Sequence, residues 1–248
     1  MSAVGRARNH PAQYDDLASE WWEPHGEFAA LHWLAAWRAE HIPPASGPEA
    51  LLVDLACGGG LMAPYAERLG YRHVGVDLNA RALDLARRHG VLPVRASVLD
   101  VPLADGCADV VLACEILEHV EDDVAVLAEA ARLLRPGGTL VIDALAATRM
   151  SVLINVHLLE RLPGGPPRGL HDPALFVDRR LLLEAADRLG LDIRLVGLRP
   201  SMRQAIPWAL GRRDMVRMKP VRWTGSVFAG YGVKRARIPA DPHVPSEA

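Results

Sequence analysis

The chain has 248 residues, half of them hydrophobic, which is enough to bury one substantial core and predicts a single domain. A formal net charge of −2 gives no sign of a surface for a polyanion, so we do not expect nucleic acid as a partner. Cys57, Cys107 and Cys114 have no metal-ligand spacing, which favours a reducing compartment and a cytoplasmic location. The N-terminal residues lack the apolar core of a signal peptide. With no uncharged apolar run of about 18 residues, a transmembrane segment is not expected either.

Short apolar runs alternate along the chain with stretches of helical spacing. The runs predicted as strands are 51–55, 73–77, 92–96, 108–114, 139–145, 192–198 and 226–233. The stretches predicted as helices are 61–69, 81–89, 123–134 and 179–189. This alternation predicts an α/β fold, a Rossmann-like, doubly wound and mostly parallel sheet. We expect one domain over residues 1–236, with an N-terminal helical cover at 10–45 and a disordered tail at 237–248.

A glycine-rich loop, residues 54–60 (DLACGGG), follows the first predicted strand. Glycines let the backbone approach a ligand closely, and the next helix offers free N–H groups to an anion. The second strand ends at Asp77, where a carboxylate can accept hydrogen bonds from ribose hydroxyls. Gly58, Gly60 and Ala63 also satisfy the dinucleotide pattern G-x-G-x-x-G/A. The loop alone therefore allows a nucleoside site, a dinucleotide site or a tight structural turn.

Charged residues follow the fourth predicted strand. If a helix begins there, Glu115, Glu118 and His119 lie at i, i+3 and i+4 on one face, where two carboxylates and an imidazole can do chemistry. The alternative is that one glutamate caps the helix while His119 packs against the sheet. A nicotinamide dehydrogenase would need its own acid and base, and the chain has no Tyr-x-x-x-Lys pair.

Several motifs occur in a distinctive order. Residues 14–23 (YDDLASEWWE), Gly26-Glu27-Phe28 and Leu31-His32 precede the glycine loop and Asp77, and residues 114–120, 136–138 (PGG) and 169–172 (GLHD) follow. In content and order, over residues 14–192, they resemble the ubiquinone-biosynthesis O-methyltransferase family of class I S-adenosylmethionine-dependent methyltransferases. The resemblance implies O-methylation of a phenolic or catechol hydroxyl on a small aromatic or prenylated quinone-precursor substrate, with S-adenosylmethionine as cofactor.

The resemblance also implies site residues. Those expected to bind the cofactor are Arg38, Asp54, Ala56, Gly58, Gly60, Asp77, Leu78, Ser97, Val98 and Cys114. Arg38 is expected near the methionine carboxylate of the cofactor, and Asp77 at the ribose. Glu115, Glu118 and His119 match catalytic positions that also bind a divalent metal, Mg²⁺, Mn²⁺ or Zn²⁺. The residues expected at the substrate are His171 and Asp172.

The chain departs from the family pattern at three places. Ala56 stands where glycine is usual, and Ser97 stands where many methyltransferases carry an acid near adenine. Residues 146–148 (AAT) replace a polar Asn-Arg-Asn run, which leaves the acceptor open. The mechanism has two alternatives: a metal chelated by a catechol would lower the phenol pKa of about 10, or His119 would act as general base.

Residues 149–175 form an insertion that we expect to cover the acceptor pocket. The apolar side of residues 150–161 could equally contact a membrane surface, so that the enzyme is peripheral to the membrane, or simply pack on the domain. Two other functions stay open, an N- or C-methyltransferase on the same scaffold and a nucleotide-binding protein without catalysis. The sequence does not indicate an oligomeric state.

Overall fold

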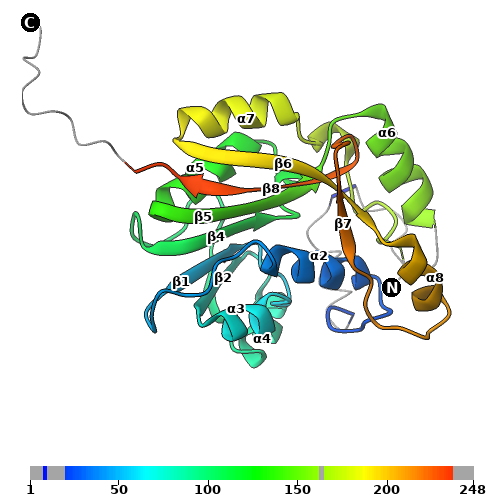
Figure 1. The fold of residues 1–248 in the computed structure, drawn as a ribbon, viewed down its shortest axis with the longest axis horizontal. Helices are drawn as coiled ribbons and strands as arrows, with labels where there is room; N and C mark the ends of the chain where they lie inside the picture. Colours follow the sequence, from blue (N-terminus) through cyan, green and yellow to red (C-terminus); the bar gives the residue numbers. More distant parts are fainter. Residues whose placement is uncertain (1–7, 10–19, 162–164, 237–248) are drawn as a thin grey trace, which may run out of the picture.

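A computed structural model of the chain describes residues 8–9, 20–161 and 165–236 (Figure 1). The strands are β1 Leu51–Leu55, β2 Arg72–Asp77, β3 Leu92–Arg95, β4 Ala108–Cys114, β5 Leu134–Leu145, β6 Leu191–Pro200, β7 Met218–Val221 and β8 Val227–Lys234. The α-helices are α2 Ala29–Ala39, α3 Ala63–Leu69, α4 Ala80–Arg88, α5 Asp123–Leu133, α6 Arg149–Ser151, α7 Arg179–Arg188 and α8 Met202–Ala209. Shorter helical turns are η1 Leu117–His119, η2 Val152–Leu158, η3 Leu159–Arg161 and η4 Pro173–Leu175, of which η2 is a π-helix.

The described strands form one sheet in the order β3-β2-β1-β4-β5-β8-β6-β7. Strands β1 to β5 pair in parallel, whereas β8 runs antiparallel between β5 and β6, and β7 lies antiparallel at the edge. The order reverses between β1 and β4, and such a reversal opens a crevice beyond the carboxyl ends of the strands. The predicted doubly wound, mostly parallel α/β sheet is confirmed.

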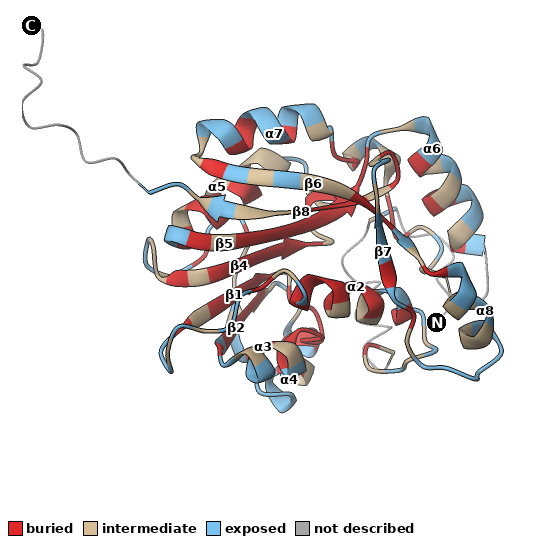
Figure 2. Cartoon of the chain, in the orientation of Figure 1, coloured by how far each residue is buried: buried red, intermediate tan, exposed pale blue. Residues whose placement is uncertain are grey.

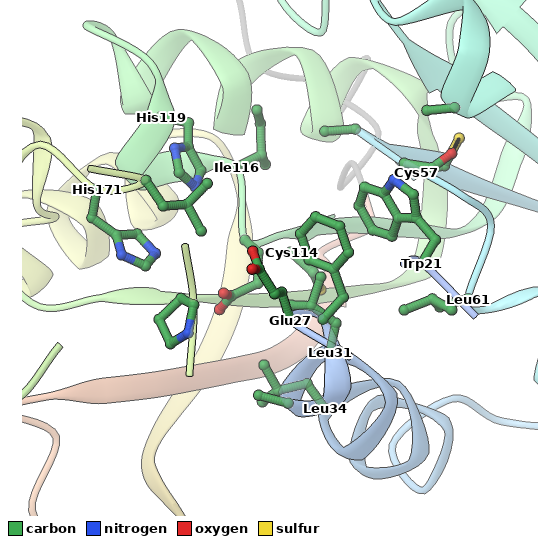
Figure 3. Close-up of a pocket in the computed structure, with 18 of the residues that line it drawn as sticks. Trp21, Glu27, Leu31, Leu34, Cys57, Leu61, Cys114, Ile116, His119 and His171 are labelled. Carbon is green, nitrogen blue, oxygen red and sulfur yellow. Dashed lines mark hydrogen bonds between the residues drawn. The ribbon is translucent and has the colours of Figure 1, made fainter. Parts of the chain in front are cut away.

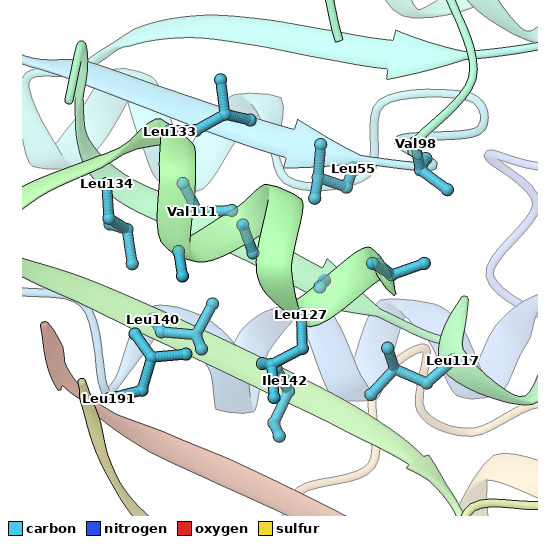
Figure 4. Close-up of a cluster of buried hydrophobic side chains, with 14 of the residues drawn as sticks. Leu55, Val98, Val111, Leu117, Leu127, Leu133, Leu134, Leu140, Ile142 and Leu191 are labelled. Carbon is cyan, nitrogen blue, oxygen red and sulfur yellow. The ribbon is translucent and has the colours of Figure 1, made fainter. Parts of the chain in front are cut away.

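Residues of the central strands are mostly buried, as their red colour in Figure 2 shows, and they are buried on both faces of the sheet. Because successive residues of a strand point to opposite faces, Val53 and Leu55 of β1 pack with α5 and α7, while Leu52 packs with α2. Figure 4 shows the first of these layers, with Leu127 of α5 over Ile142 of β5. Helices on both faces therefore fix the sheet and leave its carboxyl edge open to a ligand.

Local signals explain where the helices begin and end. The side chains of Asn79, Asp122 and Asp178 accept hydrogen bonds from the first backbone N–H groups of α4, α5 and α7. Gly70, at φ +87°, ends α3 in a left-handed conformation that costs glycine little. These capped helices match the predicted ones to within a few residues.

Two predictions about elements need correction. The strand predicted at 139–145 begins earlier, because β5 starts at Leu134 and its pairing with β4 shifts between Ala108 and Val110, which makes a bulge. The prediction lacked α8 and β7. Helix α2 forms part of the expected N-terminal cover. Three predicted segments lie outside the described residues: 10–19 of this cover, 162–164 of the insertion and the tail at 237–248. No helix in the described part of the chain is long and apolar enough to cross a membrane.

Candidate active site

A cavity of about 1740 Å³ opens beyond the carboxyl ends of β1, β2 and β4. Figure 3 shows Trp21 and Cys57 at one end of it, His119 and His171 at the other, and Cys114 between them. The predicted site residues that line it are Arg38, Asp54, Ala56, Gly58, Asp77, Leu78, Ser97, Val98, Cys114, Glu115, His119 and His171. Gly60, Glu118 and Asp172 do not line it. The fold thus brings most of the predicted residues to one cavity.

The loop after β1 is held against the end of β2 by Asp77. Its two carboxylate oxygens accept hydrogen bonds from the backbone N–H groups of Gly58 (2.9 Å) and Asn79 (2.8 Å). Burial raises the pKa of Asp77, although these hydrogen bonds act in the opposite direction. A carboxylate therefore stands at the predicted ribose position, with the glycine loop fixed beside it.

The glycines of this loop are required by close packing. A Cβ atom on Gly58, which has φ +51°, would overlap the indole ring of Trp21. A Cβ on Gly60, at φ +79°, would lie 2.9 Å from the Cβ of Ala86. Gly60 therefore serves packing rather than lining the cavity. Ala56 adopts φ +59°, a left-handed conformation in which the glycine usual in the family carries less strain.

Arg38, the residue expected near the cofactor carboxylate, belongs to a buried ion pair. Arg38 donates from Nε and Nη2 to the two carboxylate oxygens of Asp143, at 2.6 and 2.7 Å, and both side chains are buried. Sequence reasoning missed Asp143. The available signal was an acid within an otherwise apolar strand, which is rare unless the charge is paired. Arg38 lines the cavity, so the pair joins α2 and β5 at its wall.

The segment after β4 is not the predicted helix. Glu115 has φ +52°, and only the short turn η1 follows, so the i, i+3, i+4 arrangement is wrong. Glu115 lines the cavity, whereas Glu118 turns inward and accepts a hydrogen bond from the Leu145 N–H at 3.1 Å. One oxygen of each carboxyl, Oε1 of Glu115 and Oε2 of Glu118, is buried without a hydrogen-bond partner among the described residues.

Burial and mutual repulsion make these carboxyls bind protons tightly. Burial raises the pKa of Glu118 to about 8. Burial, followed by the charges of Glu118 and Asp143, raises the pKa of Glu115 well above its usual value. Three acids share this buried site with one guanidinium, that of Arg38, so not all of them can be ionised together at low cost.

The two histidines lie at the far end of the cavity. Nδ1 of His119 is 2.6 Å from Oδ1 of Asn9, and its ring stacks on that of His171 with centroids 5.6 Å apart. Burial, and then His171, lowers the pKa of His119 to about 3, so this imidazole is neutral at pH 7. His119 lines the cavity, as its predicted role in the site requires.

A buried glutamate in the insertion supports His171. Glu160 accepts a hydrogen bond from the Gly169 N–H at 3.0 Å, and its Oε1 lies 3.5 Å from Nδ1 of His171. Burial raises the pKa of Glu160, but the His171 and Gly169 hydrogen bonds outweigh it and the net direction is down. Glu160 had no signal in the sequence. Asp172, predicted at the substrate, instead accepts a hydrogen bond from the Ala174 N–H at 3.0 Å and caps η4.

The predicted three-ligand metal site is not assembled. Among the described residues, no three histidine, cysteine, aspartate or glutamate side chains are placed to hold a metal ion together. The reason lies in η1: Glu118 points to the backbone of β5, while the next residue, His119, points to Asn9.

Comparisons with known proteins agree on one kind of enzyme. Residues 53–142 match the family model described as a methyltransferase domain. The chain is 34% identical over 191 residues to the ubiquinone biosynthesis O-methyltransferase of Thiobacillus denitrificans, covering 73% of this chain and 82% of the relative. It is 32% identical over 197 residues to the protein of the same name from Albidiferax ferrireducens, covering 74% and 76%.

Solved structures show the same fold. A SAM-dependent methyltransferase from Thermotoga maritima superimposes with a TM-score of 0.62 at 20% identity, covering 90% of this chain and 97% of that one. A SAM-dependent methyltransferase from Archaeoglobus fulgidus gives a TM-score of 0.60 at 15% identity, covering 90% and 99%. At such identities the likeness concerns the fold alone.

Proposed function

Because this chain belongs to the ubiquinone biosynthesis O-methyltransferase family and is an S-adenosylmethionine-dependent methyltransferase, we propose that it methylates a phenolic hydroxyl of a small aromatic acceptor. The acceptor that we propose is a catechol ring, free or within a prenylated quinone precursor. One observation carries the proposal: a single cavity joins the glycine loop and Asp77 to Glu115 and the two histidines. A methyl donor at one end would thus face proton-binding groups at the other.

The cofactor end takes its roles from the residues that line it. We propose that Asp77 binds the ribose hydroxyls and that Arg38, steadied by Asp143, lies at the methionine carboxylate. The purine would lie against Leu78, Ser97 and Val98. Leu78 supports this, because it lines the cavity yet is 62% exposed, and a planar apolar ring would cover it. Asp54, Ala56, Gly58 and Cys114 would contribute the surrounding wall.

Methyl transfer from a sulfonium needs the acceptor as a phenolate. With a phenol pKa of about 10, forming the anion near pH 7 costs roughly 4 kcal/mol. In its ionised form Glu115 is the best placed group to take the proton, because it lines the cavity and its raised pKa makes this carboxylate a stronger base than an ordinary one. His119 is neutral and can accept a hydrogen bond or a proton, but its lowered pKa makes it a weaker base.

A divalent cation fits two of the three predicted ligands. Glu115 and Glu118 each have a buried oxygen without a partner among the described residues, and the charge of Glu118 raises the pKa of Glu115, which is the situation that a cation relieves. His119 is not placed with them. As the alternative to Glu115 acting as the base, we propose that the two glutamates would hold the ion. A bound Mg²⁺, Mn²⁺ or Zn²⁺ would supply a Lewis acid that lowers the pKa of the phenol.

Residues of the insertion line the cavity. Asn155 and Leu159 line it from η2 and η3, and His171 lines it from the loop before η4. We propose that the described parts of the insertion, residues 149–161 and 165–175, cover the acceptor and that His171, steadied by Glu160, contacts it. The same cover would exclude water from the developing phenolate.

Glu115→Gln tests the proposal. The variant keeps the shape of the side chain but cannot take a proton, so we expect kcat for a catechol to fall by about 10²-fold or more. Affinity for S-adenosylhomocysteine, measured by calorimetry, should stay the same because Glu115 is not assigned to the cofactor. Unchanged kcat would rule out Glu115. If the parent enzyme is fully active in excess chelator and His119→Ala is inactive, the mechanism needs no metal and His119 is the base.

A further inference from the structure

Two residues near the N-terminus, Arg8 and Asn9, contact the acceptor end of the cavity without a role in the reaction proposed above. Asn9 lines the cavity, and its backbone N–H donates to the Gly169 carbonyl at 3.1 Å. Arg8 donates from Nη1 to the His171 carbonyl at 2.7 Å, and the same nitrogen lies 3.3 Å from Oε1 of Glu160. Both residues are therefore fixed to segments that carry the acceptor end.

The side chain of Asn9 contacts His119 at two points. Its Nδ2 donates to the backbone carbonyl of His119 at 3.0 Å, and its Oδ1 lies 2.6 Å from Nδ1 of the His119 ring. A carbonyl only accepts hydrogen bonds, so the NH₂ end of the amide must face it and Oδ1 must face the ring. Because Oδ1 also only accepts, Nδ1 must carry a proton. The two contacts together fix the tautomer of His119.

The backbone of Asn9 is also special. It has φ +58°, in the left-handed region that asparagine enters more readily than most other residues with a side chain. Backbone held in such a conformation costs free energy and occurs where contacts or function require it. Position 9 thus suits asparagine on two independent grounds, its backbone conformation and its amide.

The tautomer decides what His119 can bind. In a neutral imidazole only one nitrogen carries a proton, so a protonated Nδ1 makes Nε2 an acceptor of hydrogen bonds. The two nitrogens lie on different sides of the ring, and with Nδ1 turned to Asn9, Nε2 points away from it. Figure 3 shows the ring of His119 beside His171 at one end of the cavity. At this end a ligand with a hydroxyl group suits His119 better than one with an ether or carbonyl oxygen.

We propose that Asn9 is a positioning residue, which holds His119 as the hydrogen-bond acceptor for one hydroxyl of the aromatic acceptor. This inference rests on the proposed function, in which Glu115 takes the proton of the other hydroxyl. A catechol that donates its second hydroxyl to Nε2 of His119 is oriented with the first toward Glu115. An acceptor without the second hydroxyl lacks this hydrogen bond and is bound less tightly and less well oriented.

Arg8 is the weaker candidate for this role. It contacts the carbonyl of His171 and not a ring, and its side chain is 42% exposed beside Glu160, so water screens the ion pair. Arg8 therefore serves as the matched control, because it joins the same N-terminal residues to the acceptor end without touching His119.

Nitrogen-15 NMR of the histidine rings reads the tautomer directly, because protonated and unprotonated ring nitrogens differ widely in chemical shift. The full-length protein has ten histidines, so the signals of His119 are assigned by their loss in His119→Gln. At pH 7 we expect a proton on Nδ1 of His119 in the parent. Asn9→Gly suits the left-handed backbone but removes both contacts, so the Nε2–H tautomer should appear. Arg8→Ala should keep the tautomer of the parent.

Asn9→Asp is the conservative variant. It keeps an oxygen at Nδ1 and should retain the proton there, although it loses the donor to the His119 carbonyl. Binding of S-adenosylhomocysteine by every variant confirms folding, because Asn9 and Arg8 are not assigned to the cofactor.

Kinetics with two acceptors then test what the tautomer is for. For the parent we expect kcat/KM to be about tenfold or more higher with a catechol than with its isosteric mono-phenol. In Asn9→Gly this ratio should fall toward one, whereas general damage to the site would lower both values and leave the ratio intact. Asn9→Asp should keep the preference.

The proposal is overturned if Nε2 carries the proton in the parent, or if Asn9→Gly leaves the tautomer unchanged. It is equally overturned if the tautomer changes while the preference for the catechol persists. If the parent methylates neither phenol, the proposed function fails, and with it the hydroxyl as the group bound by His119. The tautomers of the parent and of Asn9→Gly then still decide whether Asn9 positions His119.

Discussion

Replacing the fully buried Glu118 with glutamine should make the protein more stable at alkaline pH. Burial raises the pKa of this carboxyl from 4.5 to about 8, so between these values the folded protein holds a proton that the unfolded chain has released. Each pH unit in that window removes about 1.4 kcal/mol from the free energy of unfolding, on the order of 5 kcal/mol in all. Glutamine keeps an oxygen for the Leu145 N–H and cannot ionise, so the variant loses this dependence.

Urea unfolding from pH 5 to pH 9, in chelator, measures the effect. Glu118→Gln should match the parent near pH 5 and exceed it increasingly toward pH 9. Glu129→Gln is the control with the opposite sign, because hydrogen bonds from Arg132 lower the pKa of Glu129. The stabilisation by the Glu129–Arg132 interaction is present above pH 4.5 and disappears in acid. Glu129→Gln lacks it, so this variant should be less stable than the parent at pH 7. A Glu118→Gln curve parallel to the parent, or below it at pH 9, would refute the buried proton.

Two further changes test the cofactor loop. Asp77→Ala should weaken the binding of S-adenosylhomocysteine by about 1.5–3 kcal/mol in calorimetry. Asp84→Ala, on the exposed side of α4, should not weaken it. Binding of NAD in place of S-adenosylhomocysteine would contradict the assignment of this loop to the cofactor. Ala56→Gly should leave the free energy of unfolding unchanged or raise it, because relief of the left-handed φ of +59°, worth about 1–2 kcal/mol, offsets the entropy of glycine, about 0.5–1 kcal/mol. Ala125→Gly inside α5 should cost about 1 kcal/mol, and an equal loss at both positions would show that residue 56 is unstrained.

The sheet was predictable because its signals are local. Apolar runs and capping residues such as Asn79 act within a few positions, so the strands and helices around them follow from the sequence. The missed elements lack such signals. Helix α8 contains Pro207, and β7 has four residues with a proline among them, so only their neighbours in the fold determine them.

The candidate site was predictable where glycine and strand ends mark it, and not where packing selects the partner. The glycine-loop residues that line the cavity, and Asp77 beside them, were predicted because they follow the ends of two strands. The backbone at Glu115 turns left-handed, which a periodicity of 3.6 cannot anticipate. Asp143 pairs with Arg38, which is 105 residues away in the sequence, and Glu160 contacts His171 on the far side of a loop. Only the fold brings these partners together.

The transfer of a labelled methyl group from S-adenosylmethionine measures the proposed reaction most directly. The acceptors are a soluble catechol and its isosteric mono-phenol, each with and without a prenyl chain, in competition. We predict that the label appears as an O-methyl ether of the catechol and that the chain is not needed for it, because in the proposed function the two vicinal oxygens, and not the chain, are bound beside Glu115. A preference for the prenylated mono-phenol, or label only in N- or C-methyl products, would contradict the proposed function.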